Sequence, residues 1–358
     1  MSGRVLSTRG ADRTAWLDLL ARLPPGQRDI HYHPDYMRIY ELTYPSDEAR
    51  LIVLETANGV MFQPVMVRPV PDTDYHDMSS VYGYGGPLCT GTPDAQDRAD
   101  FAAFFQQHAS DTGAVAEFCL LHPMLADAQK ALCADGTEFD YRKEVVVADL
   151  RKPLSAIWAA IDERQRKAAL AARKAGVRVV MSDLSDGDLD AYHHRYLATM
   201  QTVGARAFWH FPENYFHNCR DALGAEHVSL FHAEAGGQII ASVFHIHMYD
   251  TVYYHFSCSD PDARKLNGTT LLLLDSLIWA HAQGFSWFHM GGGRTDEDDP
   301  LYRFKVAFSG QTLPLFSTRR ILDRSAYDAL THAVKEQEIR KTGAPRQTDF
   351  FPRYRLQT

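Results

Sequence analysis

The stretch Val228–Gly293 reads VSLFHAEAGGQIIASVFHIHMYDTVYYHFSCSDPDARKLNGTTLLLLDSLIWAHAQGFSWFHMGGG. Its alternating apolar residues predict consecutive antiparallel strands over Val228–Glu234, Gln238–Tyr249 and Thr251–Ser257. A helix over Thr270–Gln283 and a strand over Phe285–Met290 follow, and the glycine triplet at 291–293 ends that strand. This order predicts an α/β domain in which hairpins, one helix and one strand lead into a glycine-rich loop.

Helices and strands also alternate upstream of this stretch. A basic helix over Ile157–Ala175 ends at Gly176, a residue suited to a left-handed helix cap, and Val177–Met181 and Asp186–Thr202 read as a strand and a helix. The part up to Leu150 shows a weaker version of the same order. Its expected elements are Asp12–Leu23, Arg50–Glu55, Gly59–Val67, Gln96–Ser110, Ala114–Leu121 and Glu144–Ala148, with an Asn58-Gly59 hairpin turn. Two related α/β halves with mixed sheets flanked by helices are therefore expected.

Composition and charge narrow the class of protein. The chain has 358 residues, 45% of them hydrophobic, which is ample for a globular core. No apolar run is long enough to cross a membrane, the N-terminus has no apolar leader, and five scattered cysteines indicate reduced thiols. We therefore predict a cytoplasmic protein without a transmembrane segment.

The net charge of −8 argues against general affinity for DNA, but its distribution is uneven. Residues 151–178 hold eight basic and two acidic side chains, and residues 301–358 hold eleven basic and five acidic ones. Each segment is either a solvated surface or a local binding site for a polyanion.

Several motifs together resemble the FemABX type of aminoacyl transferase, within the GNAT-like acyltransferase superfamily. Gln165–Gly176 (QRKAALAARKAG) is similar to the helix that opens the second domain of these proteins, and Tyr196–Phe216 to a helix-and-loop segment. Tyr253–Ser259 (YYHFSCS), Gly284–Phe308 and the Tyr82–Leu88 turn resemble further family motifs. His289 departs from the family, where aspartate is common at that position.

The resemblance implies two tandem GNAT-like domains and transfer of an amino acid from aminoacyl-tRNA to an amine, forming an amide. The acceptor would be a small molecule or a peptide, such as a peptidoglycan precursor or a natural-product intermediate. We predict a first domain over residues 1–150, a second over 151–317, and a basic segment over 318–358 that packs back on the first. No cofactor is predicted.

Candidate site residues follow from the motifs and from charge. Lys305 matches a substrate-binding lysine of the family, and its cation suits the oxyanion formed during acyl transfer or a phosphate. Phe304 would pack beside the substrate or simply in the core. Arg206 and Arg294, in loops, are candidates for phosphate or carboxylate binding, or solvent-facing side chains.

The hairpin Ser242–Ser259 carries an unusual set of histidines and tyrosines. Strict alternation predicts that Tyr253, His255 and Ser257 share one face and that Tyr254 and Phe256 share the other. His255 is a candidate general base, and either Tyr254 or Tyr253 is a candidate for binding the acceptor. His245 and His247 share a strand face, but no third ligand stands out, so no metal site is predicted.

Two alternative functions remain open. Lys265–Thr270 (KLNGTT) keeps the central glycine of a GNAT pyrophosphate loop but lacks its first and last residues, so acyl-CoA is the alternative co-substrate. A non-catalytic binding protein on a GNAT-like scaffold is the second alternative. Under the aminoacyl-tRNA hypothesis, Arg340 and Lys341 are predicted to contact the tRNA.

Overall fold

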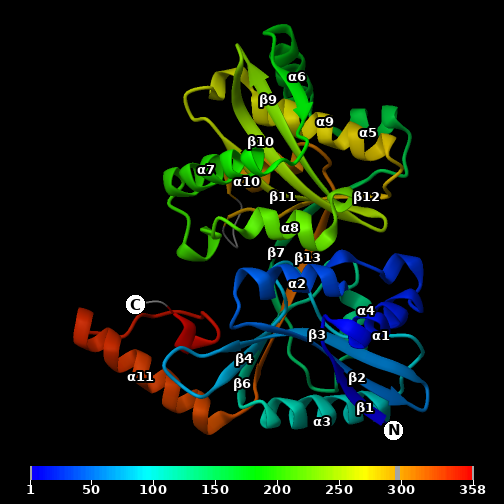
Figure 1. The fold of residues 1–358 in the computed structure, drawn as a ribbon, viewed down its shortest axis with the longest axis vertical. Helices are drawn as coiled ribbons and strands as arrows, with labels where there is room; N and C mark the ends of the chain where they lie inside the picture. The colour runs from blue at the N-terminus through cyan, green and yellow to red at the C-terminus, as the bar shows by residue number, and fades with distance from the viewer. Residues whose placement is uncertain (1, 295–298, 357–358) are drawn as a thin grey trace. The chain divides into compact units, whose positions relative to one another are not determined.

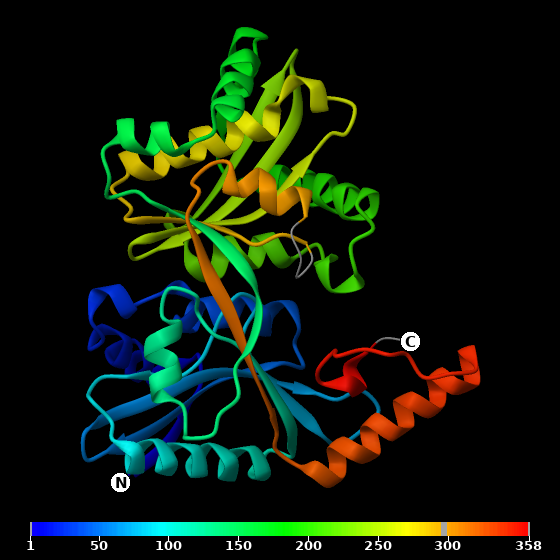
Figure 2. The same ribbon diagram turned by 180° about the vertical axis from the view of Figure 1, so that it is seen from behind.

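The structure is a computed structural model that describes residues 2–294 and 299–356. The chain folds into two compact units, and each is described by itself (Figure 1, Figure 2). Unit 1 comprises Met1–Arg142 and Leu315–Thr358, and unit 2 comprises Lys143–Pro314. The predicted fold class, α/β with mixed sheets flanked by helices, is confirmed.

Unit 2 is built on a mixed sheet. Its strand order is β7-β12-β11-β10-β9-β8, in which β11 and β12 are parallel and the other pairs are antiparallel. The strands are β7 (Asp140–Asp149), β8 (Arg178–Met181), β9 (Val228–Ala235), β10 (Gln238–Met248), β11 (Thr251–Ser259) and β12 (Trp287–Gly291). The strands expected from residue 228 to residue 291 are thus present in the expected order.

Helices cover both faces of this sheet. On one face, α9 (Gly268–Ala282) packs across β9 and β10 (Figure 1). The hydrophobic core under α9 includes Leu271, Leu274 and Leu277. On the other face, α7 (Asp186–Thr202) and α8 (Tyr215–Leu223) bury aromatic side chains, and Tyr192 stacks on Phe244 with ring centroids 5.9 Å apart.

The basic helix predicted over Ile157–Ala175 is wrong in one respect, because the chain forms two helices there. They are α5 (Leu154–Ala160) and α6 (Glu163–Lys174). Ile161 between them has extended backbone and is 2% exposed in the core, and the Asp162 N–H donates to the carbonyl of Ala307 at 2.8 Å. A tertiary contact therefore interrupts a helical pattern. The predicted cap is confirmed: Gly176 has φ +87°.

In unit 1 the strands of the sheet have the order β1-β2-β3-β4-β6-β13, with β5 paired to β3. The strands are β1 (Ser2–Leu6), β2 (Glu48–Thr56), β3 (Gly59–Pro69), β4 (His76–Ser79), β5 (Leu88–Cys89), β6 (Ala114–Leu120) and β13 (Thr312–Ile321). The helices of unit 1 are α1 (Gly10–Ala21), α2 (Pro34–Thr43), α3 (Ala95–Asp111), α4 (Ala126–Leu132) and α11 (Arg324–Thr342). Phe101 and Phe105 of α3 pack into the core of this sheet.

The C-terminal segment belongs to unit 1 and is tied there by buried ion pairs. Arg353 binds Glu338 of α11 at 2.6 Å, and the Glu338 side chain is 1% exposed. Arg355 binds Asp77 at 2.6 Å, and the Asp77 side chain is also 1% exposed. These arginines therefore serve the fold of unit 1.

Among the residues that the structure describes, no helix combines the length and the apolar character needed to cross a membrane.

Candidate functional site

The parallel pair β11–β12 opens at a glycine-rich loop. Its ladder joins Thr251–Tyr253 to Trp287–His289. Beyond His289, β12 reaches Gly291, whose φ of +73° turns the chain into Gly292 and Gly293. α10 (Pro300–Val306) follows after residues 295–298, which lie outside the described structure.

Lys305 lies on α10 under this loop. Its side chain is buried, with the residue 8% exposed, and Nζ donates to the carbonyl of Gly292 at 2.7 Å. Nζ also lies 5.9 Å from the ring centroid of Tyr254 on β11. The structure thus brings two predicted site residues, Lys305 and Tyr254, together.

The surroundings of Lys305 disfavour its charge. Burial is the main cause, the neighbouring Lys143 adds to it, and Asp299 opposes both, so that the pKa of Lys305 falls from 10.5 to about 7. Lys143 Nζ donates to the carbonyl of Gly293 at 3.2 Å. Two lysines therefore approach consecutive carbonyls of the glycine loop.

Asp299 holds α10 in position. Its Oδ1 accepts from the N–H groups of Leu301 and Tyr302 at 2.8 and 2.9 Å, and Pro300 occupies the first helical position. Its other oxygen accepts from the N–H of Arg294. The Asp299-Pro300 pair was the sequence signal for this cap, but neither Asp299 nor Lys143 was among the predicted site residues.

Tyr254 and Phe304 lie in largely apolar surroundings. Burial raises the pKa of Tyr254 to about 12, so the phenol stays neutral and able to donate. Phe304 packs against the unit 2 core, with its ring centroid 5.2 Å from that of Phe308.

A β-bulge at His255 changes the facing of β11. Phe244 pairs with Phe256 and the next residue, His245, pairs with Tyr254, so His255 is the extra residue. The prediction that Tyr254 and Phe256 share a face is therefore wrong, because the bulge reverses the alternation between them.

The bulge directs His255 to a partner on α8. Tyr215 Oη and His255 Nε2 are 2.8 Å apart, and the two rings are nearly parallel at 12°. Tyr215 lies within the Tyr196–Phe216 motif but was not among the predicted site residues. Tyr253 lies against His289, with ring centroids 5.0 Å apart.

The two predicted loop arginines are exposed. Arg206 precedes the short 3-10 helix η3 (Ala207–Trp209), and its carbonyl accepts from the N–H of Trp209 at 2.9 Å. Arg294 follows the glycine triplet. Both side chains can therefore contact either solvent or a ligand, and the two arginines stay candidates for binding phosphate or carboxylate.

The predicted tRNA contacts lie in unit 1. Arg340 and Lys341 are exposed in the last turn of α11, and Arg340 is 3.6 Å from Glu336.

The segment Lys265–Thr270, interpreted from the sequence as a degenerate pyrophosphate loop, leads into α9. Arg264 and Lys265 are exposed, Asn267 adopts the left-handed conformation, and α9 begins at Gly268. A Cβ on Gly268 would lie 2.9 Å from Ile240 Cδ1, so close packing of helix on strand already accounts for this glycine.

The two histidines of β10 point toward aromatic surroundings. His245 is fully buried, both its ring nitrogens lack a hydrogen-bond partner among the described residues, and burial lowers its pKa to about 3. His247 Nε2 lies 2.8 Å from Ser229 Oγ. Burial also lowers the pKa of His247, to about 4, so both rings are neutral at pH 7. Within the described chain, no third ligand joins the pair.

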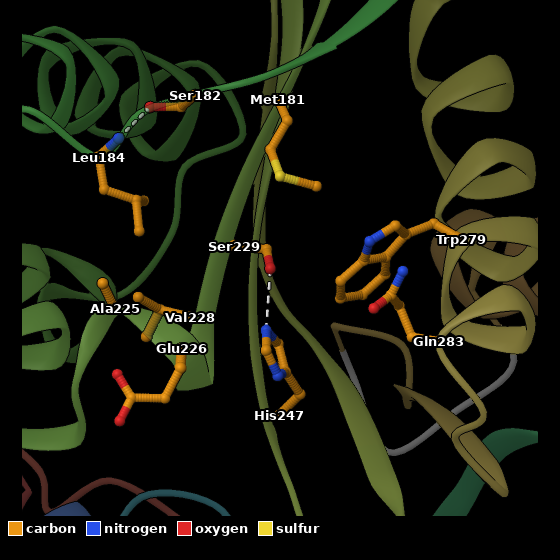
Figure 3. Close-up of a pocket in the computed structure, with 10 residues that line it drawn as sticks. All are labelled: Met181, Ser182, Leu184, Ala225, Glu226, Val228, Ser229, His247, Trp279 and Gln283. Atoms are coloured by element: carbon orange, nitrogen blue, oxygen red, sulfur yellow. Dashed lines mark hydrogen bonds between the residues drawn. The ribbon is translucent and has the colours of Figure 1, made fainter.

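A pocket of about 470 Å³ lies beside His247 in unit 2 (Figure 3). Trp279 of α9 faces it across from Met181. Its lining comprises Met181, Ser182, Leu184, Ala225, Glu226, Val228, Ser229, His247, Trp279 and Gln283. None of the predicted site residues lines this pocket.

Part of unit 2 is similar to a known family of protein domains. Residues 161–305 match the family model described as an acetyltransferase (GNAT) domain. This part of the chain is therefore similar to an acetyltransferase domain of the GNAT type. This domain spans the hairpins, α9, the glycine loop and Lys305. No curated protein matches the chain.

Solved structures extend the GNAT-like fold to nearly the whole chain. FemX superposes with a TM-score of 0.66 at 14% identity, covering 92% of this chain and 99% of FemX. A tandem GNAT protein from the clavulanic acid biosynthesis pathway gives 0.51 at 12% identity, covering 89% and 98%. The C-terminal domain assigned to a lysylphosphatidylglycerol synthetase of Agrobacterium fabrum gives 0.51 at 14% identity, covering 91% and 96%. The predicted FemABX-like, tandem GNAT fold is confirmed.

Proposed function

We propose that this protein transfers an aminoacyl group from aminoacyl-tRNA to an amine, forming an amide bond. The observation that carries the proposal is the buried Lys305, whose Nζ lies 2.7 Å from the Gly292 carbonyl under the glycine loop of a GNAT-type domain. The fold likeness to FemX and to the lysylphosphatidylglycerol synthetase domain supports an aminoacyl donor.

The chemistry assigns Lys305 to the oxyanion. The acceptor nitrogen attacks the ester carbonyl, a C–N bond forms, and the carbonyl oxygen becomes negative. A protonated Lys305 Nζ stabilises that oxygen more than the neutral carbonyl, which lowers the barrier. The C–O bond then breaks, and the ribose hydroxyl leaves with a proton while the nitrogen loses one.

Tyr254 and His255 have separate proposed roles. Tyr254, 5.9 Å from Lys305 Nζ, contacts the acceptor and donates a hydrogen bond through its neutral phenol. His255 receives the proton from the amine, with the Tyr215 hydroxyl holding its ring. Tyr253, Phe304, Arg206 and Arg294 are the further substrate-contact candidates.

Acyl-CoA is the second candidate donor, and one observation favours it. Arg264 and Lys265 are exposed just before α9, where the free N–H groups of the first helical turn attract phosphate. The short loop there is where a GNAT protein would hold the CoA pyrophosphate.

The test offers both donors to the purified protein. Charged tRNAs carrying labelled amino acids and, separately, labelled acetyl-CoA are mixed with amine acceptors, and amide products are followed by mass spectrometry. Label transfer from charged tRNA, absent with deacylated tRNA, supports the proposal. Transfer from acetyl-CoA alone replaces it with the second candidate, and transfer from neither points to a non-catalytic protein.

Lys305→Ala tests the residue that carries the proposal. Removing an oxyanion-stabilising group should lower kcat about 10²- to 10³-fold while donor binding persists. Lys174→Ala, which removes an exposed lysine at the end of α6, is the matched control. Full activity in a folded Lys305→Ala protein would remove Lys305 from the chemistry.

A further inference from the structure

Unit 1 gathers three metal-ligating side chains that the acyl-transfer chemistry does not use. One ligand atom each from Asp29, His31 and His122 lies within 4.8 Å of the others. The three residues are 4%, 4% and 2% exposed, so protein encloses the cluster. Asp29 and His31 flank the start of η2 (Ile30–Tyr32), and His122 follows β6.

The distances fit a shared ion. Asp29 Oδ1 lies 2.7 Å from His31 Nδ1, and Asp29 Oδ2 lies 3.4 Å from His122 Nε2. Ligands of one Zn²⁺ lie roughly 3 to 3.5 Å from one another when each is about 2.1 Å from the metal. The two histidine nitrogens approach different oxygens of Asp29, and the ligand atoms all lie within 4.8 Å of one another, so a small rearrangement of the side chains would let all three residues bind one ion.

Hydrogen bonds of Gln129 hold the backbone at His122 in place. The Gln129 side chain accepts from the backbone N–H of His122 at 2.8 Å and donates to the carbonyl of Gly85 at 2.7 Å and to Tyr32 Oη at 2.9 Å. These bonds fix the segment that carries His122 next to Tyr32 and the glycine-rich turn.

The glycine-rich turn Tyr82–Pro87 closes over His31. Gly83 has φ +106°, and a Cβ there would lie 2.2 Å from His31 Nε2. Only glycine allows the backbone to approach the imidazole so closely. The turn noticed in the sequence thus has a place in the structure that acyl transfer does not explain.

We propose that Asp29, His31 and His122 bind one divalent transition-metal ion. Two imidazoles and a carboxylate suit Zn²⁺, which leaves a further coordination position for water or another ligand. The ion would join η2 to the segment after β6 and would thereby stabilise unit 1. The proposal is independent of the acyl donor.

A hydrogen-bonded network without metal is the competing arrangement. In it, His31 Nδ1–H and His122 Nε2–H both donate to Asp29, and His122 Nδ1 accepts from the N–H of Met124 at 3.3 Å. Binding of an ion to Nε2 moves the His122 proton to Nδ1 and breaks that long Met124 contact. The two arrangements therefore differ in whether a metal ion is bound and in whether the Met124 N–H donates to His122 Nδ1.

The test uses the full chain, purified without a metal-affinity tag and stripped with a chelator. Titration with CoCl₂ should give one bound equivalent and the visible absorption of Co²⁺ with nitrogen and oxygen ligands. Titration with ZnCl₂ should displace the Co²⁺ and raise the thermal unfolding midpoint. Binding of less than about a tenth of an equivalent, with an unchanged midpoint, would overturn the proposal in favour of the network.

His122→Gln supplies the specific variant. It should weaken Co²⁺ binding by at least about tenfold, as loss of a ligand requires. His232→Gln is the matched control, because His232 is also buried and lies 3.0 Å from a single carboxylate, Asp188, in unit 2. Equal Co²⁺ binding by the His122→Gln and wild-type proteins would place the ion elsewhere and also overturn the proposal.

Discussion

Lys305 is kept where its charge is disfavoured. Enclosure by protein and the nearby Lys143 bring the pKa of its ammonium to about 7, while Asp299 and the Gly292 carbonyl partly compensate. A lysine of this kind changes protonation within the physiological range. An approaching anion would restore its charge, as a transition-state oxyanion requires.

The stability of the protein should therefore depend on pH through Lys305. Between pH 7 and 10.5 the unfolded chain holds a proton on this lysine that the folded chain has released. The free energy of unfolding should thus rise with pH in this window, by up to a few kcal/mol at about 1.4 kcal/mol per pKa unit.

Urea unfolding of the wild type and of Lys305→Met at a series of pH values measures this contribution. The Met variant should lack the rise, and Lys174→Met on the exposed face of α6 should keep it. Parallel pH profiles for the wild type and Lys305→Met would mean that the pKa of Lys305 is the same in the folded and unfolded states, which would contradict this prediction.

At the scale of elements, the start of α9 combines a packing requirement with a possible ligand site. Gly268 meets Ile240 of β10 at the first position of the helix, and Ala233 of β9 also lies close. A close helix–strand approach explains the glycine without reference to CoA. The same sequence feature therefore has a structural cause and cannot by itself decide the donor.

Gly268→Ala should be less favourable than the same change at an open helical glycine. A new Cβ at 2.9 Å from Ile240 Cδ1 forces a shift costing about 1 to 3 kcal/mol, against a gain of up to about 1 kcal/mol in helix propensity. Gly187→Ala on α7 is the control, because an added Cβ there would meet no neighbouring segment within 4 Å.

Denaturant unfolding of both variants gives the comparison. Adding Ile240→Val, which removes Cδ1, should recover part of the loss at Gly268 and change nothing at Gly187. Equal stabilisation by both alanines would show that α9 can move away from β10 freely.

At the scale of the whole molecule, the net charge of −8 coexists with a basic C-terminal segment whose arginines are partly used by the fold. Arg319, Arg353 and Arg355 bind Asp140, Glu338 and Asp77 at 2.8, 2.6 and 2.6 Å. The positive charge available to bind a polyanion is therefore smaller than the number of basic residues in this segment suggests. The remaining charge lies on the exposed face of α11.

Charged-tRNA binding should weaken when Arg340 and Lys341 are both replaced by alanine. Loss of two phosphate contacts reduces the slope of log affinity against log salt by roughly 1 to 2. Affinity for a small amine acceptor should stay unchanged. Arg324→Ala with Lys335→Ala removes the same charge from the same helix and is the control.

Filter binding across a salt series measures both double variants. An affinity and salt slope for the Arg340/Lys341 variant that match the wild type would exclude this end of α11 from the tRNA contact.

Local pattern was enough for the elements from residue 228 to 291, because alternation, turn residues and helix periodicity are properties of neighbouring residues. It failed where distant contacts override it. Ile161 is buried in the core and interrupts a continuous helical pattern, and the bulge at His255 places Tyr254 and Phe256 on opposite faces of the sheet.

The sequence by itself determined the α/β class, the tandem GNAT-like order and the lysine after the glycine triplet, since each is written in residues that are close along the chain. Only the tertiary structure decided that Lys305 is buried beside Tyr254 and that Tyr215 contacts His255. It also decided that Asp29, His31 and His122 form one buried cluster. Burial and proximity between distant segments arise only when the core closes, and they set the pKa values and ligand geometry on which the chemistry depends.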